Sequence, residues 1–196
     1  MCFSEKASLI ALVAGLSSSL ACYSVGKPEY KIVGLFFAFV TLMQLVDYLL
    51  WKHQVCDAYN KMVSFVGMIL NHLQPVVLFT LLWYFNKPTD IRVLVVYLFF
   101  IIPYSFRKLG CTMKGSDSHM WWSWNTDNNE LYKQIVYGVF ILSLALMAYK
   151  GLGRIEGLYI VLTFAITNMV YNQEYSVGSL WCFFVVISPL VYMLKN

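Results

Sequence analysis

Charged residues are scarce in this chain of 196 residues, since Asp, Glu, Lys and Arg together make up 12% of it. A soluble domain usually carries about 25%. Hydrophobic residues make up 60%, which is more apolar surface than one soluble core of this size can bury. The composition therefore predicts an all-α, polytopic integral membrane protein, with residues 1–196 forming a single membrane domain. Lipid is its expected partner. The composition does not indicate which membrane, and it leaves a homo-oligomer open.

Runs of Lys and Arg are also missing, and no zinc-finger spacing occurs. Nucleic acid is therefore not an expected partner. The net charge of +4 is spread thinly along the chain. A modest basic surplus of this kind suits contact with anionic lipid headgroups.

The five cysteines contain no CxxC pair, so their spacing indicates neither a disulfide framework nor a zinc knot. Cys22 and Cys182 lie in apolar runs and are expected to be buried. The sequence also lacks HExxH, GxSxG and Walker motifs. No lysine suited to a retinal Schiff base and no regular arginine spacing for voltage sensing are present. Whether the protein is an enzyme stays open.

Apolar stretches of about 20 residues, enough to cross the hydrocarbon of a bilayer, recur along the chain. About seven transmembrane helices are predicted, of which the fourth and fifth are short. The first segment resembles a signal peptide in part, but Glu5 in its charged region favours a first transmembrane helix. Ser4 is its expected N-cap. The predicted segments are Ser8–Val25, Ile32–Trp51, Met62–Phe85, Ile91–Phe106, Gln134–Tyr149, Ile155–Tyr171 and Tyr175–Leu194.

The orientation of these helices is not determined by the positive-inside rule. We call side A the end that holds the N-terminus and the loops after the second, fourth and sixth segments, and side B the opposite end. Each side receives seven Lys and Arg residues. Side B carries its charges on uniformly short loops, which weakly favours side B as cytoplasmic.

Polar residues inside the predicted segments indicate where a functional site would lie, because such groups are costly in a membrane. Among the acidic residues, Asp47 alone lies well inside a predicted segment, the second one. His72 lies near the middle of the third. A titratable pair of this kind suits proton or ion handling. Individually, the amides are better explained as hydrogen bonds between helices, whereas the pair of Asp47 and His72 favours a function. The predicted polar intramembrane site, which opens towards side A, consists of Gln44, Asp47, Asn71, His72, Gln74 and Asn168.

Side A also holds groups that suit a metal or a reactive thiol. Cys2, near the start of a helix, is a possible thiolate, and Cys2, Asp47 and His72 together would suit zinc or copper. Cys2, Cys56, Cys111, His53 and His119 are all expected on side A. A metal site or a disulfide is therefore allowed there, although the spacing specifies neither. The sequence Met120-Trp121-Trp122-Ser123-Trp124 in the long connection predicts a membrane-surface anchor, with a lid over the bundle as the alternative.

The N-terminal half resembles a family of small polytopic membrane proteins from bacteria and large DNA viruses that begin with Met-Cys-Phe-Ser. The resemblance rests on Met1-Cys2-Phe3-Ser4-x-x-Ala7-Ser8 and on Gln44-x-x-Asp47-x-x-x-Trp51. The bacterial pattern has Glu-Gly where this chain has Asp47-Tyr48, so the carboxyl group is kept and the glycine is not. The resemblance implies a multi-pass membrane protein, which could be a viral one. It implies no specific activity.

Three functions fit these observations. The leading hypothesis is a conduit or transporter for protons, ions or a small polar solute, with Asp47 and His72 as the titrating groups. The second is a membrane-embedded enzyme or redox protein with a metal or thiolate centre on side A. The third is a structural membrane protein, in which the polar groups only hold the helices together.

Overall fold

The computed structural model describes residues 4–107, 109–115, 119–122, 130–170, 181 and 185–195. These residues form an all-α bundle, as predicted, with a single two-stranded β-hairpin in the described part. The α-helices are α1 (Glu5–Ser24), α2 (Pro28–Lys52), α3 (Ala58–Tyr84), α4 (Ile91–Ser105), α5 (Glu130–Gly151), α6 (Arg154–Val170) and α8 (Ser188–Lys195). A 3-10 turn, η1 (Val185–Ile187), precedes α8, and the hairpin pairs β1 (Met113–Lys114) with β2 (Met120–Trp121).

Four of these helices, α1, α2, α3 and α5, are long and apolar enough to cross a membrane. This is consistent with the predicted membrane protein, because a helix satisfies its own backbone polar groups in lipid. The fourth helix is short, with 15 residues, as predicted. The fifth is longer than predicted, since it extends beyond the apolar run to Glu130 at one end and Gly151 at the other. Part of the seventh predicted segment lies outside the described residues.

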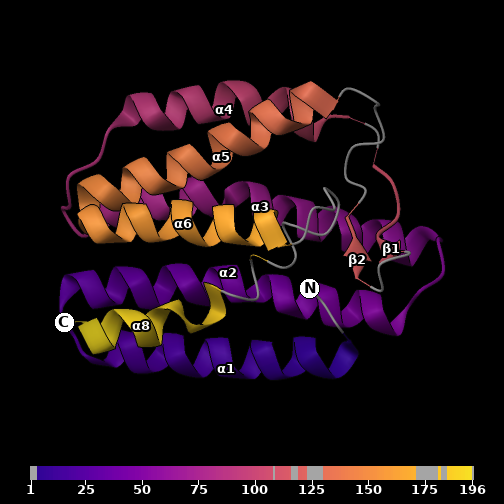
Figure 1. Ribbon diagram of the computed structural model, residues 1–196, viewed down its shortest axis with the longest axis horizontal. Helices are drawn as coiled ribbons and strands as arrows, with labels where there is room; N and C mark the ends of the chain where they lie inside the picture. The colour runs from indigo at the N-terminus through magenta and orange to yellow at the C-terminus, as the bar shows by residue number, and fades with distance from the viewer. Residues whose placement is uncertain are drawn as a thin grey trace.

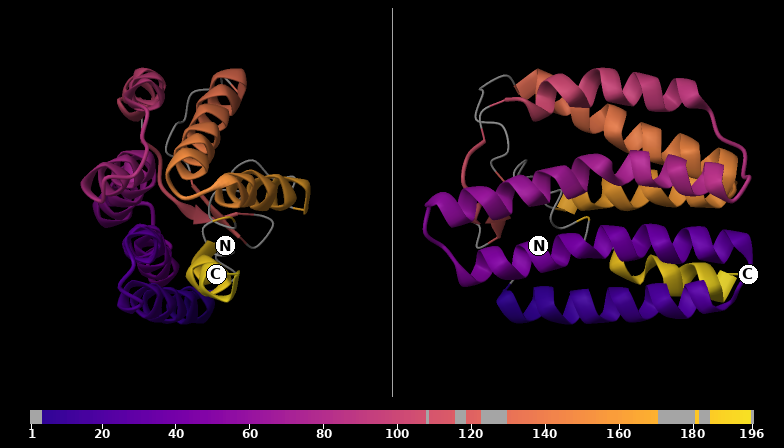
Figure 2. Two further views of the ribbon diagram at one scale, coloured as in Figure 1. Left: turned by 90° about the vertical axis from the view of Figure 1, so that its left-hand side faces the viewer. Right: turned by 180° about the vertical axis from the view of Figure 1, so that it is seen from behind.

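The helices run side by side along the long axis of the molecule (Figure 1). Viewed end-on, α1, α2, α3 and α4 follow one another along an arc, and α5, α6 and α8 fill its inner side (Figure 2). Helix α2 packs between α1 and α3, while α5 contacts α3, α4 and α6. The turn after α2 and the hairpin share one end, side A, and the α1–α2, α3–α4 and α5–α6 turns share the other, side B.

The helix ends follow from local sequence. Ser4 is the predicted N-cap of α1, and its hydroxyl oxygen accepts a hydrogen bond from the backbone N–H of Ala7 at 3.1 Å. Gly26, with φ of 87°, lets the chain reverse into α2, which begins with Pro28 at a position where a missing N–H is harmless. Asp57 and Asp90 cap α3 and α4 in the same manner as Ser4.

Helices α1 and α2 approach each other closely because small residues lie between them. A Cβ atom on Gly34 would come within 2.6 Å of the backbone oxygen of Ser19, and one on Gly15 within 2.5 Å of the hydroxyl of Thr41. Small residues at such contacts are typical of helix packing in membranes. Cys22, on the same side of α1, is fully buried, as predicted for that cysteine.

Large apolar side chains cover the outside of the bundle. Leu20, Phe99 and Met169 are 68%, 75% and 80% exposed. Exposed large apolar side chains recur on every described α-helix, which is not typical of a protein surrounded by water. It supports the placement of the outer helix faces against lipid.

Candidate functional site

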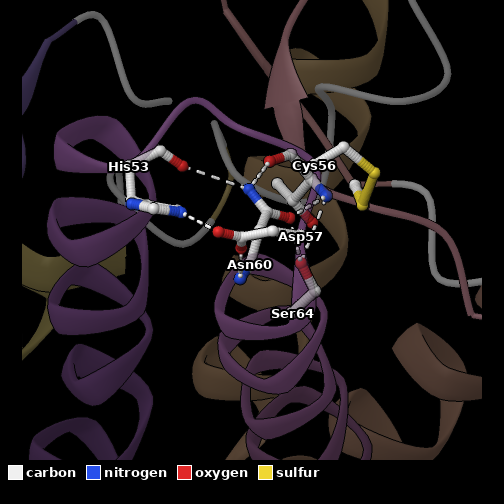
Figure 3. Close-up of a disulfide and its surroundings, with 7 residues drawn as sticks. His53, Cys56, Asp57, Asn60 and Ser64 are labelled. Atoms are coloured by element: carbon white, nitrogen blue, oxygen red, sulfur yellow. Dashed lines mark hydrogen bonds and ion pairs between the residues drawn. A yellow bond between two sulfur atoms is a disulfide. The ribbon is translucent and has the colours of Figure 1, made fainter.

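A disulfide ties two connections together at side A. Cys56, in the turn between α2 and α3, is bonded to Cys111, in the connection between α4 and α5, with their Cα atoms 5.6 Å apart (Figure 3). The expectation that the cysteines form no disulfide framework is therefore wrong for this pair. The spacing along the chain, 55 residues, does not identify the pair, although the predicted topology placed both cysteines at side A, where a disulfide was allowed.

Next to the disulfide, the first turns of α3 hold the backbone of the long connection. The side-chain amide of Asn60 donates to the carbonyl oxygen of Thr112 at 2.9 Å, and its oxygen accepts from the N–H of Thr112 at 3.1 Å. The Ser64 hydroxyl accepts from the same N–H. Both side chains are fully buried. Because the amide satisfies both backbone groups of Thr112, this part of the connection is fixed on the bundle.

The turn itself is stabilised by a side-chain hydrogen bond between His53 and Asp57. The His53 Nε2 atom lies 2.8 Å from a carboxylate oxygen of Asp57, whose second oxygen accepts from the backbone N–H of Asn60 at 2.9 Å (Figure 3). The Asn60 N–H, and then His53, lower the pKa of Asp57 below its ordinary value. Asp57 is therefore a charged cap of α3 at neutral pH.

The same connection reaches into the bundle through Trp122. Its indole N–H donates to a carboxyl oxygen of Asp47, on α2, at 3.0 Å. Asp47 is fully buried and Trp122 is 7% exposed. The expectation of a membrane-surface anchor is therefore wrong for Trp122, because its ring is inside the protein. The alternative interpretation, a lid over the end of the bundle, agrees with its position.

Below Asp47, buried amides continue towards the middle of the bundle. Gln44 lies one turn from Asp47 on the same face of α2, and Asn71 and Gln74 lie one turn apart on α3. All three are at most 5% exposed. Gln74 donates to the side-chain oxygen of Asn71 at 3.4 Å. Its own side-chain oxygen has no hydrogen-bond partner among the described residues, which is unusual for a buried polar atom and suits a bound water or solute.

His72 is held elsewhere. Its Nδ1 atom lies 2.8 Å from the hydroxyl of Ser105, on α4, and its ring packs against Tyr104. The Tyr97 hydroxyl donates to the His72 carbonyl oxygen at 2.6 Å, within the helical turn where Pro75 interrupts the backbone ladder. These contacts direct His72 towards α4, whereas Asp47 is held by Trp122. Asp47 thus contacts Trp122, and His72 contacts Ser105 and Tyr104.

The remaining predicted site residues are not gathered with the others. Asn168 is exposed on the surface of α6, and the neighbouring Thr167 takes the inward position. The exposed position of Asn168 differs from the place inside a polar site that the sequence predicted for it. Cys2, the proposed thiolate, and Cys182 lie outside the described residues.

Zinc or copper at Cys2, Asp47 and His72 remains a prediction. Within the part of the chain that the structure describes, no three His, Cys, Asp or Glu side chains gather as a metal site would require. Of the three predicted ligands, Asp47 contacts Trp122 and His72 contacts Ser105.

Three side chains of this end were not identified from the sequence: Asn60, Ser64 and Thr112, which fix the connection. Asn60 and Ser64 are spaced by one helical turn and continue through Gly67 to Asn71 and Gln74, so a polar stripe on α3 was a usable signal. Nothing in the sequence pairs Trp122 with Asp47, 75 residues away.

Comparison of the chain with protein-family models, with curated proteins and with solved structures gave no match in any of the three. The resemblance of the N-terminal half to the Met-Cys-Phe-Ser family therefore stays a prediction.

Proposed function

We propose that this membrane protein conducts or transports protons, ions or a small polar solute through a site centred on Asp47. The observation that carries the proposal is a fully buried carboxyl group inside a helix of spanning length, five residues before the side A end of α2. Ionisable groups at such positions are costly and by default indicate a function. The Trp122 indole supplies a hydrogen bond without a charge, so Asp47 can change its protonation or its partner at this contact without breaking a salt bridge there.

The buried amides supply a route from Asp47 towards the middle of the membrane. Gln44 continues the face of Asp47, and Asn71 and Gln74 present donors and acceptors from α3. The Gln74 side-chain oxygen suits one more donor or a cation. Beyond this level the core of α2 and α3 is apolar, with Ile32, Phe36 and Leu78 almost fully buried. A polar entry from side A and an apolar barrier towards side B fit a gated pathway rather than an open pore.

In this proposal Trp122 controls access to Asp47. The indole belongs to a connection that the disulfide and Asn60 fix on the bundle, so access to Asp47 would open by rotation of the Trp122 side chain rather than by movement of a helix. His72 is assigned an anchoring role, because Ser105 and Tyr97 connect its turn of α3 to α4.

Flux measurements on purified protein in liposomes test the proposal. A pH-sensitive dye inside the liposomes reports proton entry driven by a potassium diffusion potential, and the same liposomes can be assayed with sodium or a small polyol. We expect the wild type to conduct at least one of these and Asp47→Asn to lose that flux. Glu5→Gln, an exposed carboxyl at the same end, is the matched control and should keep it. Equal flux in Asp47→Asn and wild type would remove Asp47 from the mechanism.

A structural membrane protein is the second candidate, and a specific observation favours it. Several buried polar contacts, such as His72 with Ser105 and Trp181 with Thr163, join two elements and need no ligand. If none of the probes moves through the wild-type protein while Asp47→Asn lowers its thermal stability, the structural candidate takes precedence.

A further inference from the structure

The disulfide indicates how the bundle is oriented across the membrane, which the equal numbers of Lys and Arg on the two sides do not. Cys56 and Cys111 lie in two different connections, and both connections are at side A. Asn60 and Ser64 fix the residue after Cys111 beside the first turns of α3. The two cysteines are therefore held together by the fold, and the bond joins connections that already meet.

From this we infer that side A faces an oxidising compartment, such as the cell exterior, the periplasm or the lumen of the endoplasmic reticulum, and that side B faces the cytosol. Disulfides form and persist in oxidising compartments, whereas cytosolic thiol systems keep cysteines reduced. The two cysteines belong to the same end of a membrane-spanning bundle. The disulfide therefore indicates which compartment the whole of side A faces. The remaining described cysteine, Cys22, is buried within α1 and adds no constraint.

The acidic residues, unlike the basic ones, are divided unequally between the two ends. Seven basic residues but only three acidic ones, Glu29, Asp90 and Glu156, belong to side B, so that end carries a net side-chain charge of +4. The other seven basic and seven acidic residues of the chain cancel. The cytoplasmic leaflet is the one rich in anionic lipids, which attract a basic end. An excess charge at side B therefore stabilises side B against the cytosolic leaflet.

This orientation does not depend on the proposed transport. The orientation adds one property to the proposed transport: the Asp47 site, which Trp122 contacts, opens away from the cytosol. A solute or proton would reach Asp47 from the oxidising compartment, and its entry would pass the disulfide-anchored connection.

Cysteine labelling in spheroplasts of a bacterial host, with the full chain in the inner membrane, tests the orientation. Lys61→Cys and Lys27→Cys make the same change at exposed positions of side A and side B, respectively. The probe is a membrane-impermeant maleimide with a mass tag, and the wild-type chain serves as the background. We expect Lys61→Cys to be labelled in intact spheroplasts, and Lys27→Cys only after lysis. Labelling of Lys27→Cys in intact spheroplasts, with or without Lys61→Cys, overturns the inference.

A second measurement on wild-type protein keeps the test independent of how the variants fold. Cells are lysed in an alkylating reagent, and the protein is digested without reduction. The peptides that contain Cys56 and Cys111 should be recovered as one linked species that separates after reduction. Recovery of both cysteines in alkylated form would show that this end is not in an oxidising compartment, and would also overturn the inference.

Discussion

The indole N–H of Trp122 donates a hydrogen bond to the carboxyl group of Asp47, 3.0 Å away, although the two residues are 75 positions apart. Asp47 lies inside the bundle on α2, and Trp122 directly follows the short β-hairpin at side A. The disulfide and the Asn60–Thr112 contacts fix that connection on the bundle. A buried acidic group and a covalently anchored connection are thereby part of one structural unit.

Replacing Trp122 by Phe tests this contact. The ring keeps most of its apolar volume but loses the donor, and a buried acceptor that loses a hydrogen bond costs about 1–3 kcal/mol. We expect the thermal unfolding midpoint of the detergent-purified protein to fall. Trp83→Phe is the matched control, since Trp83 is 68% exposed near the side B end of α3, and it should change the midpoint little. Equal shifts in the two variants would contradict the assigned role of Trp122.

The disulfide should stabilise the fold because it restricts the unfolded chain, by an amount that grows slowly with the length of the loop that it closes. Its partners are 55 residues apart, and a closed loop of this order stabilises by about 2–4 kcal/mol. We expect dithiothreitol to lower the unfolding midpoint of the wild type. The double variant Cys56→Ser/Cys111→Ser should unfold at that lower temperature with or without the reductant. A wild-type midpoint that does not respond to reductant, once mass spectrometry shows both thiols free, would refute this prediction.

Two glycines offer opposite outcomes for the same substitution. Gly34→Ala places a methyl group against the backbone of α1, 2.6 Å from the Ser19 oxygen, and overpacking of this kind costs about 1–3 kcal/mol. Gly138→Ala, in α5, has open space at its Cβ position and should gain about 0.5–1 kcal/mol from helix propensity. Unfolding midpoints that move in the same direction would show that the α1–α2 packing is not as close as described.

Asp90 links the start of α4 to the end of α5 and should make stability depend on pH. Its side chain bonds Arg92 and Lys150, and together with the Arg92 N–H these contacts hold its pKa well below the usual range. A lowered folded-state pKa stabilises the fold above the unfolded value of about 4, and this contribution is lost as the pH falls below it. The midpoint of Asp90→Asn should therefore lie below that of the wild type by a constant amount at neutral pH. The gap should close in acid, and a gap that stays unchanged there would contradict the ion-pair assignment.

The helices could be predicted from the sequence because apolar runs of about 20 residues have one stable solution in lipid. Burial of Gln44, Asp47, Asn71, His72 and Gln74 followed from the cost of polar groups in such runs. Their partners did not follow. Whether Asp47 meets His72 depends on the rotation and order of the helices, and the exposed position of Asn168 shows the same limit.

The side A end was the part least accessible to sequence reasoning. Cys56 contacts Cys111, and Asp47 on α2 contacts Trp122. Both contacts join parts of the chain that come together only in the complete topology. Neither contact has a characteristic spacing, because each partner lies on a different element. By contrast, the Ser4 cap follows a local rule and was predicted correctly.

The measurement that tests the central role of Asp47 most directly combines chemical modification with flux. A hydrophobic carbodiimide reacts with protonated carboxyl groups inside the membrane, and mass spectrometry of the digested protein gives the modified fraction at Asp47. We expect flux through wild-type protein in liposomes to fall in proportion to that fraction. Glu5→Gln should behave as the wild type. Complete modification of Asp47 with flux unchanged would contradict the account.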